Sequence, residues 1–219
     1  MRDDKRVCLL DFDGTLVDSM GAFADIAADV MQAHYGLPFA EARQRYLETS
    51  GIPFFQQLDL IFPEGQQNSV LAEEFEVRKL AGFFEEPYFE GAIETLEFLR
   101  SRGVVTAISS NNFQHNVDEF MVRNPAPFDH VLGFREGFAK GRDHFDYVMR
   151  AEGVTAEAVV FVGDSIKDGE RAQESGVSFV GRTGTFGRAD FLSRFPSIVV
   201  IDSLVELKEL YAAGRNWTV

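Results

Sequence analysis

The stretch RVCLLDFDGTLVDS, residues 6–19, predicts how the chain begins to fold, because an apolar run ends abruptly in acids. Residues 6–10 are typical of a buried strand, and Asp11 and Asp13 follow it with one phenylalanine between them. Burying an unpaired carboxylate costs free energy. The two acids therefore indicate a site at the end of the strand and not a place in its core.

The composition of the whole chain limits the class of protein. With 219 residues and 45% hydrophobic content, the chain can build one sizeable core, or a main domain with a smaller inserted one. The formal net charge of -14 opposes binding to nucleic acid or to anionic membrane surfaces. The single cysteine, Cys8, is expected to be a small buried hydrophobe.

No apolar stretch approaches the roughly 20 residues of a membrane span, and the start MRDDKRV lacks the apolar run of a signal peptide. A cytoplasmic location is therefore the default expectation. The sequence carries no signal for an oligomeric state.

Short apolar runs alternate with segments of helical spacing, which is typical of a parallel α/β sheet. Because the runs are continuously apolar, we expect helices on both faces of this sheet. The expected strands are 6–10, 104–109, 130–133, 158–162, 177–180 and 198–201. The expected helices are 91–102, 113–123, 143–152, 168–175 and 203–212.

One interval interrupts the alternation. From about residue 19 to residue 88 there is no convincing strand, and the helical patterns there predict an inserted all-helical domain. Pro87 marks the expected return to the main domain, so residues 1–18 and 88–219 form the predicted core and 19–87 the predicted cap. Within the insert, LAEEFEVRK, residues 71–79, is interpreted as a solvated acidic helix face.

Three predicted strands end in polar residues. The first ends at Asp11, the 158–162 run is followed by Asp164, and the 104–109 run by Ser109, Ser110 and Asn111. The carboxyl ends of parallel strands converge on one crevice, so these groups are expected to meet. A hard divalent cation would hold Asp11, Asp13 and Asp164 together, and Mg²⁺ is favoured because it takes carboxylates, waters and substrate phosphate.

The spacing of the two acids suggests separate roles in catalysis. Asp11 and Asp13 leave the strand end on similar sides, so one can attack while the other handles protons. Gly14 permits the sharp turn after them, and Thr15 offers a supporting hydroxyl, so both are expected beside a bound phosphate. A carboxylate nucleophile beside Mg²⁺ suits phosphoryl transfer through an aspartyl phosphate.

A transferred phosphoryl group also needs donors for its equatorial oxygens and a cation to offset its charge. The hydroxyl of Ser110, the backbone N–H of Asn111 and a lysine can supply them.

Four stretches in this order resemble the motifs of the haloacid dehalogenase-like hydrolases, in the phosphatase branch with a helical cap inserted after the first motif. That resemblance implies a Rossmann-like core. The four stretches are DFDGTLVDS from Asp11, VVTAISSNN from Val104, FAKGRDHFDYVMRAEGV from Phe138 and VVFVGDSIKDGERAQESGV from Val159.

The resemblance implies a role for each matched residue. Asp11 is the nucleophile, Asp13 the acid and base, and Ser110 with Asn111 the phosphoryl clamp; the count from Gly103 favours Ser110 over Ser109. The resemblance also makes Lys140 the charge partner of Asp11 and of the phosphate. It makes Asp11, the Asp13 carbonyl and Asp164 the Mg²⁺ ligands. Asp168 would be an outer residue that orients a metal-bound water or Lys140.

Two details modify the resemblance. Many relatives have Lys-Pro at the third motif, whereas in this chain Lys140 is followed by Gly141, which would loosen the turn. Asp13 disfavours halide displacement, because haloacid dehalogenases proper usually lack an acid there.

Three functions remain open from the sequence. The leading hypothesis is a Mg²⁺-dependent phosphatase acting on a small phosphorylated metabolite. The others are a phosphomutase acting on a sugar phosphate through the same intermediate, and a catalytically silent module that binds a phosphorylated ligand. The conceivable substrate contacts are Arg43, Arg45, Tyr46, Phe54 and Phe55 in the cap, and Arg182 or Arg188 in the 181–190 loop.

Overall fold

The computed structural model describes residues 6–212 and contains a parallel six-stranded sheet. Its strands are β1 (Val7–Leu10), β2 (Val105–Phe113), β3 (His130–Phe134), β4 (Val159–Gly163), β5 (Ser178–Arg182) and β6 (Val199–Ile201). They lie in the order β3-β2-β1-β4-β5-β6, and every neighbouring pair is parallel. β1 therefore sits at the point where the strand order reverses, which is where such sheets bind ligands.

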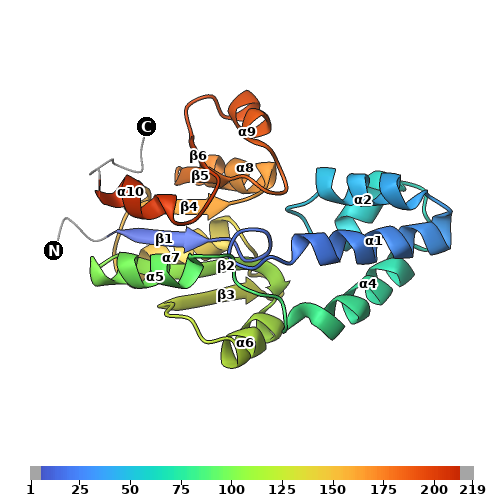
Figure 1. Cartoon of the computed structure of the whole chain (residues 1–219), viewed down its shortest axis with the longest axis horizontal. Coiled ribbons are helices and arrows are strands. Elements are labelled where there is room, and N and C mark those ends of the chain that lie inside the picture. The colour runs from blue at the N-terminus through green and yellow to red at the C-terminus, as the bar shows by residue number, and fades with distance from the viewer. Residues whose placement is uncertain (1–5, 213–219) are drawn as a thin grey trace.

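Both faces of the sheet are covered by helices, as expected (Figure 1). Successive residues of β1 point to opposite faces, so Cys8 and Leu10 join one apolar core while Val7 and Leu9 join the other. On the first face lie α5 (Ala92–Ser101), α6 (Gln114–Arg123) and α10 (Glu206–Ala212). On the second lie α7 (Arg142–Glu152), α8 (Ile166–Glu174), α9 (Arg188–Arg194) and the short 3₁₀ turn η1 (Ala156–Ala158).

Four further helices gather beyond the carboxyl ends of the strands, on the right of Figure 1. These are α1 (Met20–Tyr35), α2 (Phe39–Glu48), α3 (Phe54–Ile61) and α4 (Asn68–Phe83). Aromatic rings pack between them, with ring centroids 4.3 Å apart for Phe54 and Phe75 and 5.7 Å apart for Tyr46 and Phe54. The expectation of a helical segment between the first strand and the rest of the sheet is confirmed.

The interpretation of residues 71–79 as a solvated acidic face is wrong for one side of α4. Leu71, Phe75 and Lys79 are buried there, while Glu73 is exposed. These three residues recur every four positions, so they share the side of the helix that packs against its neighbours. The acidic residues between them dominate the composition and hide this pattern.

The two segments that join the α1–α4 helices to the sheet lie side by side. The Asp18 N–H donates to the Pro87 carbonyl at 2.9 Å, and the Phe89 N–H donates to the Leu16 carbonyl at 2.9 Å. Val17 forms an isolated antiparallel bridge with Tyr88. Domain limits at 18/19 and 87/88 stay a prediction, which this pairing supports.

Three of the elements that differ in extent from the expected ones are β2, α8 and α9. β2 continues to Phe113 and shifts register against β3 between Ser109 and Phe113, although asparagine is depleted in strands. α8 begins at Ile166 because the side chains of Ser165 and Asp168 form a capping box. α9 begins at Arg188, inside the 181–190 segment that was expected to be a loop, and continues beyond that segment. Among residues 6–212, no helix is long and apolar enough to cross a membrane.

Candidate active site

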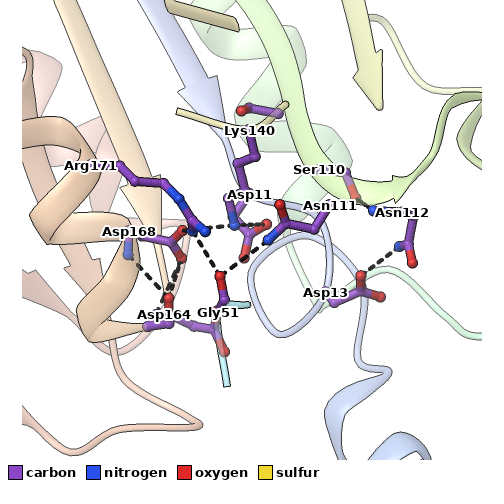
Figure 2. Close-up of polar contacts among 12 residues, drawn as sticks. Asp11, Asp13, Gly51, Ser110, Asn111, Asn112, Lys140, Asp164, Asp168 and Arg171 are labelled. Carbon is purple, nitrogen blue, oxygen red and sulfur yellow. Dashed lines mark hydrogen bonds and ion pairs between the residues drawn. The ribbon is translucent and has the colours of Figure 1, made fainter. Parts of the chain in front are cut away.

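In the loop after β1, the side chain of Phe12 lies in the apolar core, whereas the carboxylates of Asp11 and Asp13 lie at the site. The Asp11 N–H donates to the Val162 carbonyl of β4 at 2.8 Å, which anchors the strand end. Phe12 is fully buried and packs edge-on against Phe120, with ring centroids 4.9 Å apart. Because the ring of Phe12 fills the core, the carboxylates of Asp11 and Asp13 are free to lie at the strand ends (Figure 2).

A buried cluster of charges surrounds Asp11. The Lys140 Nζ lies 2.6 Å from Asp11 Oδ1 and 2.7 Å from Asp168 Oδ1. Carboxylate oxygens of Asp11, Asp164 and Asp168 lie within 4.8 Å of one another, and all three residues are buried. The structure therefore brings together the acids that the sequence placed at the ends of β1 and β4, with one ammonium among three carboxylates.

The pKa values in this cluster reflect the excess of carboxylates over ammonium groups. Burial raises the pKa of Asp11 well above its ordinary value; Asp168 and Asp164 raise it further, while Lys140 opposes the shift. Burial and the Asp168 charge raise the pKa of Asp164 to about 6. Burial alone would lower the pKa of Lys140, but Asp11 and Asp168 raise it above its ordinary value. The lysine is held charged, and the cluster as a whole favours a further cation.

The glycine after Lys140 explains the departure from Lys-Pro. Gly141 has a φ of 109°, which the proline ring cannot adopt. A Cβ at this position would also lie 3.0 Å from Arg171 Cδ. The turn therefore needs glycine, and it delivers Lys140 to Asp11.

Asp168 acts through its neighbours. Its Oδ2 accepts a hydrogen bond from the Ser165 hydroxyl at 2.8 Å, and its Oδ1 pairs with Lys140 and lies 3.4 Å from Arg171 Nη1. Both oxygens are thus engaged by the protein. This geometry favours the role of orienting Lys140 over direct ligation of a metal.

The two candidate serines of β2 point in different directions. The Ser109 Oγ hydrogen-bonds His144 Nδ1 at 2.9 Å on the α7 side of the sheet. The Ser110 Oγ accepts from the Asn112 backbone N–H at 3.0 Å (Figure 2). Ser110 therefore lies on the side of the site, which favours it as the phosphate-binding hydroxyl. The Thr15 hydroxyl is buried and has no hydrogen-bond partner among the described residues.

Asp13 is held by two donors. Its Oδ1 accepts from the Ser19 hydroxyl at 2.7 Å and its Oδ2 from the Asn112 side-chain amide at 2.6 Å. The Asn112 Oδ1 in turn accepts from Lys79 Nζ of α4 at 3.1 Å. Burial raises the pKa of Asp13, and the charge of Lys79 opposes that rise. Sequence reasoning missed Asn112, although it stands beside Asn111 in the quoted motif, and gave no signal for Lys79.

The loop between α2 and α3 contacts the α/β part of the chain at the site. The Gly51 carbonyl accepts hydrogen bonds from Arg171 Nη1 at 2.8 Å and from Asn111 Nδ2 at 3.1 Å (Figure 2). Arg171 comes from α8 and Asn111 from β2, so two elements of the α/β part hold one carbonyl of the α2–α3 loop. This loop therefore lies against the strand ends.

A cavity of about 270 Å³ lies between the α1–α4 helices and the strand ends. It reaches Asp11, Asp13, Lys140 and Asp164, and Tyr46, Phe54 and Phe55 line it as substrate contacts were expected to do. Arg43 pairs with Asp25 and Arg45 with Glu41, and neither arginine lines the cavity. Substrate contact stays a prediction, and the cavity supports it for the three aromatic residues and not for the two arginines.

The 181–190 loop reaches the crevice through a threonine and not through an arginine. The Thr185 hydroxyl donates to Asp164 Oδ2. Arg182 donates to the Gly14 carbonyl at 2.7 Å and lies over the Phe89 ring, whereas Arg188 bonds Asp202 and the Val200 carbonyl. Both arginines are held by protein groups.

The chain is similar in sequence to known proteins. A family model described as haloacid dehalogenase-like hydrolase matches residues 8–182. The chain is 30% identical to the phosphoglycolate phosphatase of Synechococcus elongatus over 190 residues, covering 81% of this chain and 84% of the relative. It is 27% identical to that of Pseudomonas savastanoi pv. phaseolicola over 213 residues, covering 92% and 78%.

Solved structures agree in fold. A haloacid dehalogenase-like family protein from Streptococcus pneumoniae superposes with a TM-score of 0.79 at 20% identity, covering 95% of this chain and 99% of the other. A family hydrolase from Deinococcus radiodurans, solved with bound phosphate and sodium, gives 0.70 at 25% identity and covers 99% of each chain.

The sheet, its acidic strand ends and these matches define a hydrolase that acts on phosphoric monoesters. The chain belongs to the haloacid dehalogenase-like hydrolase family, and it is a phosphatase of that family.

Replacing Gly14 is expected to impair catalysis more than stability. Gly14 has a φ of 73°, and a Cβ there would overlap the Asp164 carboxylate, so Gly14→Ala displaces a residue of the cluster. We expect phosphatase activity to fall by about 100-fold, the cost of a misplacement near 1 Å. Gly36→Ala is the matched control, because Gly36 has a φ of 68° and open space around it. Equal activity in the two variants would contradict this expectation.

Proposed function

We propose that this protein is a Mg²⁺-dependent phosphatase that hydrolyses a small phosphomonoester through an aspartyl phosphate on Asp11. The observation that carries the proposal is the buried contact of Asp11 with Lys140, beside Asp164 and Asp168. A carboxylate held by an ammonium in a water-poor crevice is a suitable nucleophile for phosphorus.

The residues fit a hard divalent cation. Asp11 and Asp164 offer carboxylate oxygens close together, and one lysine leaves the three-acid cluster with excess negative charge. Oxygen donors with few protein ligands suit Mg²⁺, which keeps waters and substrate phosphate in its coordination shell. Asp11, Asp164 and the Asp13 carbonyl would hold the ion, with Asp168 acting through Lys140. Bound there, Mg²⁺ would neutralise charge on the transferred phosphoryl group.

The steps follow from the positions of the side chains. The Asp11 carboxylate attacks phosphorus, and the bond from phosphorus to the alcohol oxygen breaks. Asp13, protonated at this stage, gives its proton to the departing alkoxide. The Asp13 carboxylate then takes a proton from a water molecule that attacks the aspartyl phosphate, releasing inorganic phosphate and restoring Asp11.

Other residues bind the phosphoryl oxygens and exclude water. Ser110 and the backbone N–H of Asn111 would donate to the equatorial oxygens, and Gly14 and Thr15 would lie beside them. Residues 19–87 would act as a cap, and the hydrogen bonds that Gly51 accepts from Arg171 and Asn111 support a closed position. A closed cap protects the aspartyl phosphate from bulk solvent.

Phosphate release from a panel of esters tests this function. The panel contains p-nitrophenyl phosphate, phosphoglycolate, ethyl phosphate, benzyl phosphate and a hexose phosphate, each assayed with Mg²⁺ and with a chelator. We expect release of inorganic phosphate that depends on Mg²⁺. Isomerisation of the hexose phosphate without phosphate release would support a phosphomutase instead, and binding without turnover of any ester would support a silent binding module.

A further inference from the structure

The cavity wall that would surround the alcohol part of the ester is mostly apolar. Of the described residues that line the cavity from α1–α4, only Glu76 and Lys79 carry charge. Both lie on α4 and line the cavity together with Asp11 and Asp13 at the strand ends. The charges of these two residues therefore decide which alcohols the cavity accepts.

The positive charge of Lys79 is already satisfied within the protein. Its Nζ lies 2.6 Å from Glu76 Oε2 and 3.1 Å from Asn112 Oδ1, and it stands over the rings of Phe23 and Phe75 at 5.6 Å each. The side chain of Lys79 is 7% exposed. An incoming anion would have to displace Glu76 to pair with this ammonium.

A negative charge on the alcohol would also meet a negative neighbour. Glu76 lines the cavity, and its carboxylate already holds the ammonium of Lys79. Inside a protein, like charges a few ångströms apart repel more strongly than in water. An ester whose alcohol carries a carboxylate is therefore disfavoured relative to an uncharged one of similar size.

Two aromatic rings at the cavity are left open to solvent. Phe55 of α3 is 52% exposed and Phe113 at the end of β2 is 45% exposed, and both line the cavity. One ring comes from α3 and the other from β2, so each side of the cavity offers an exposed aromatic surface to a bound ester. Covering such rings removes apolar surface from water and is favourable.

We propose that Glu76 is a specificity-determining residue: its ion pair with Lys79 makes the site select phosphomonoesters of uncharged, ring-bearing alcohols over esters whose alcohol carries a carboxylate. This inference rests on the proposed phosphatase function. The cavity volume of about 270 Å³ restricts the alcohol to a small one.

Three esters separate the effects of charge and shape. Phosphoglycolate differs from ethyl phosphate by a carboxylate in place of a methyl group, and benzyl phosphate adds a ring. For the wild-type protein with Mg²⁺ we expect kcat/KM to be highest for benzyl phosphate and lowest for phosphoglycolate. A wild-type preference for phosphoglycolate over both other esters would overturn the proposal.

The variant Glu76→Gln isolates the role of the ion pair. Removing the negative charge frees Lys79 to pair with the substrate carboxylate, so the ratio of kcat/KM for phosphoglycolate to that for ethyl phosphate should rise by about tenfold. The difference in reactivity between the phosphoglycolate and ethyl phosphate leaving groups is the same in wild type and variant. It therefore cancels when the two ratios are compared. Glu73→Gln, on the exposed side of the same helix, should leave the ratio unchanged.

The outcomes distinguish this proposal from the function on which it rests. An unchanged ratio in Glu76→Gln, with all three esters hydrolysed, overturns the role of Glu76 and leaves the phosphatase intact. Failure of the wild-type protein to hydrolyse any ester, including p-nitrophenyl phosphate, overturns both. Because the Glu76 side chain is 34% exposed, the variant is expected to fold, and circular dichroism would check this.

Discussion

Asp11→Asn is expected to lower kcat for every phosphate ester by at least about 10⁴-fold, because the substitution removes the nucleophile. The amide has nearly the same shape as the carboxylate, and the Asp11 N–H bond to Val162 and the Lys140–Asp168 pair do not depend on the lost charge. The fold should therefore persist. Steady-state assays with p-nitrophenyl phosphate and Mg²⁺ measure the loss.

A nearby acid provides the control. Asp18 lies in the same motif but is exposed, and Asp18→Asn should keep wild-type kcat. Near wild-type turnover in Asp11→Asn would contradict the proposed covalent mechanism. Two carboxylates pair with Lys140, and of these only Asp11 follows β1. An equal loss in both variants would indicate a general effect of charge and not the loss of a nucleophile.

The positions of the acids at the strand ends were predictable, because they follow from the residues next to them in the sequence. An apolar run that ends in an acid specifies both a strand and the edge at which its side chains emerge. Parallel pairing then brings Asp11 next to the polar end of β2 and the end of β4. The order of the strands was not predictable in this way. It depends on which apolar faces pack together across the whole chain.

The cap side of the site was not predictable, because its residues act through contacts between distant segments. Lys79 and Asn112 are 33 residues apart and meet only when α4 packs over the strand ends. Arg171 and Gly51 are 120 residues apart, and their hydrogen bond requires the loop between α2 and α3 to lie against α8. A lysine in an acidic helical stretch and a glycine in a turn have many ordinary explanations, so their sequence positions alone carry no such signal.

Asp164→Asn is expected to remove Mg²⁺ dependence and to lower kcat by about 10³-fold, because one of the proposed metal ligands is lost. The same variant should change how stability depends on pH. In the folded protein without metal the pKa of Asp164 is about 6, above its ordinary value of 3.8. The folded state then binds more protons than the unfolded state between these two values, so the contribution of Asp164 to stability falls as pH rises through 6.

The difference in unfolding free energy between Asp164→Asn and wild type therefore carries a definite sign. Without metal, the variant should be more stable at pH 8, on the order of 2 kcal/mol, and the advantage should vanish near pH 4. Comparing the two proteins cancels the titrations of groups that do not interact with Asp164, such as that of His144, whose pKa is lowered to about 4, chiefly by burial. Adding Mg²⁺ at pH 8 should stabilise the wild type by about 2.7 kcal/mol at 100 times its Kd and the variant much less. Equal stabilisation of both proteins by Mg²⁺ would place the ion elsewhere, because a cation held by Asp164 must respond to the loss of its charge.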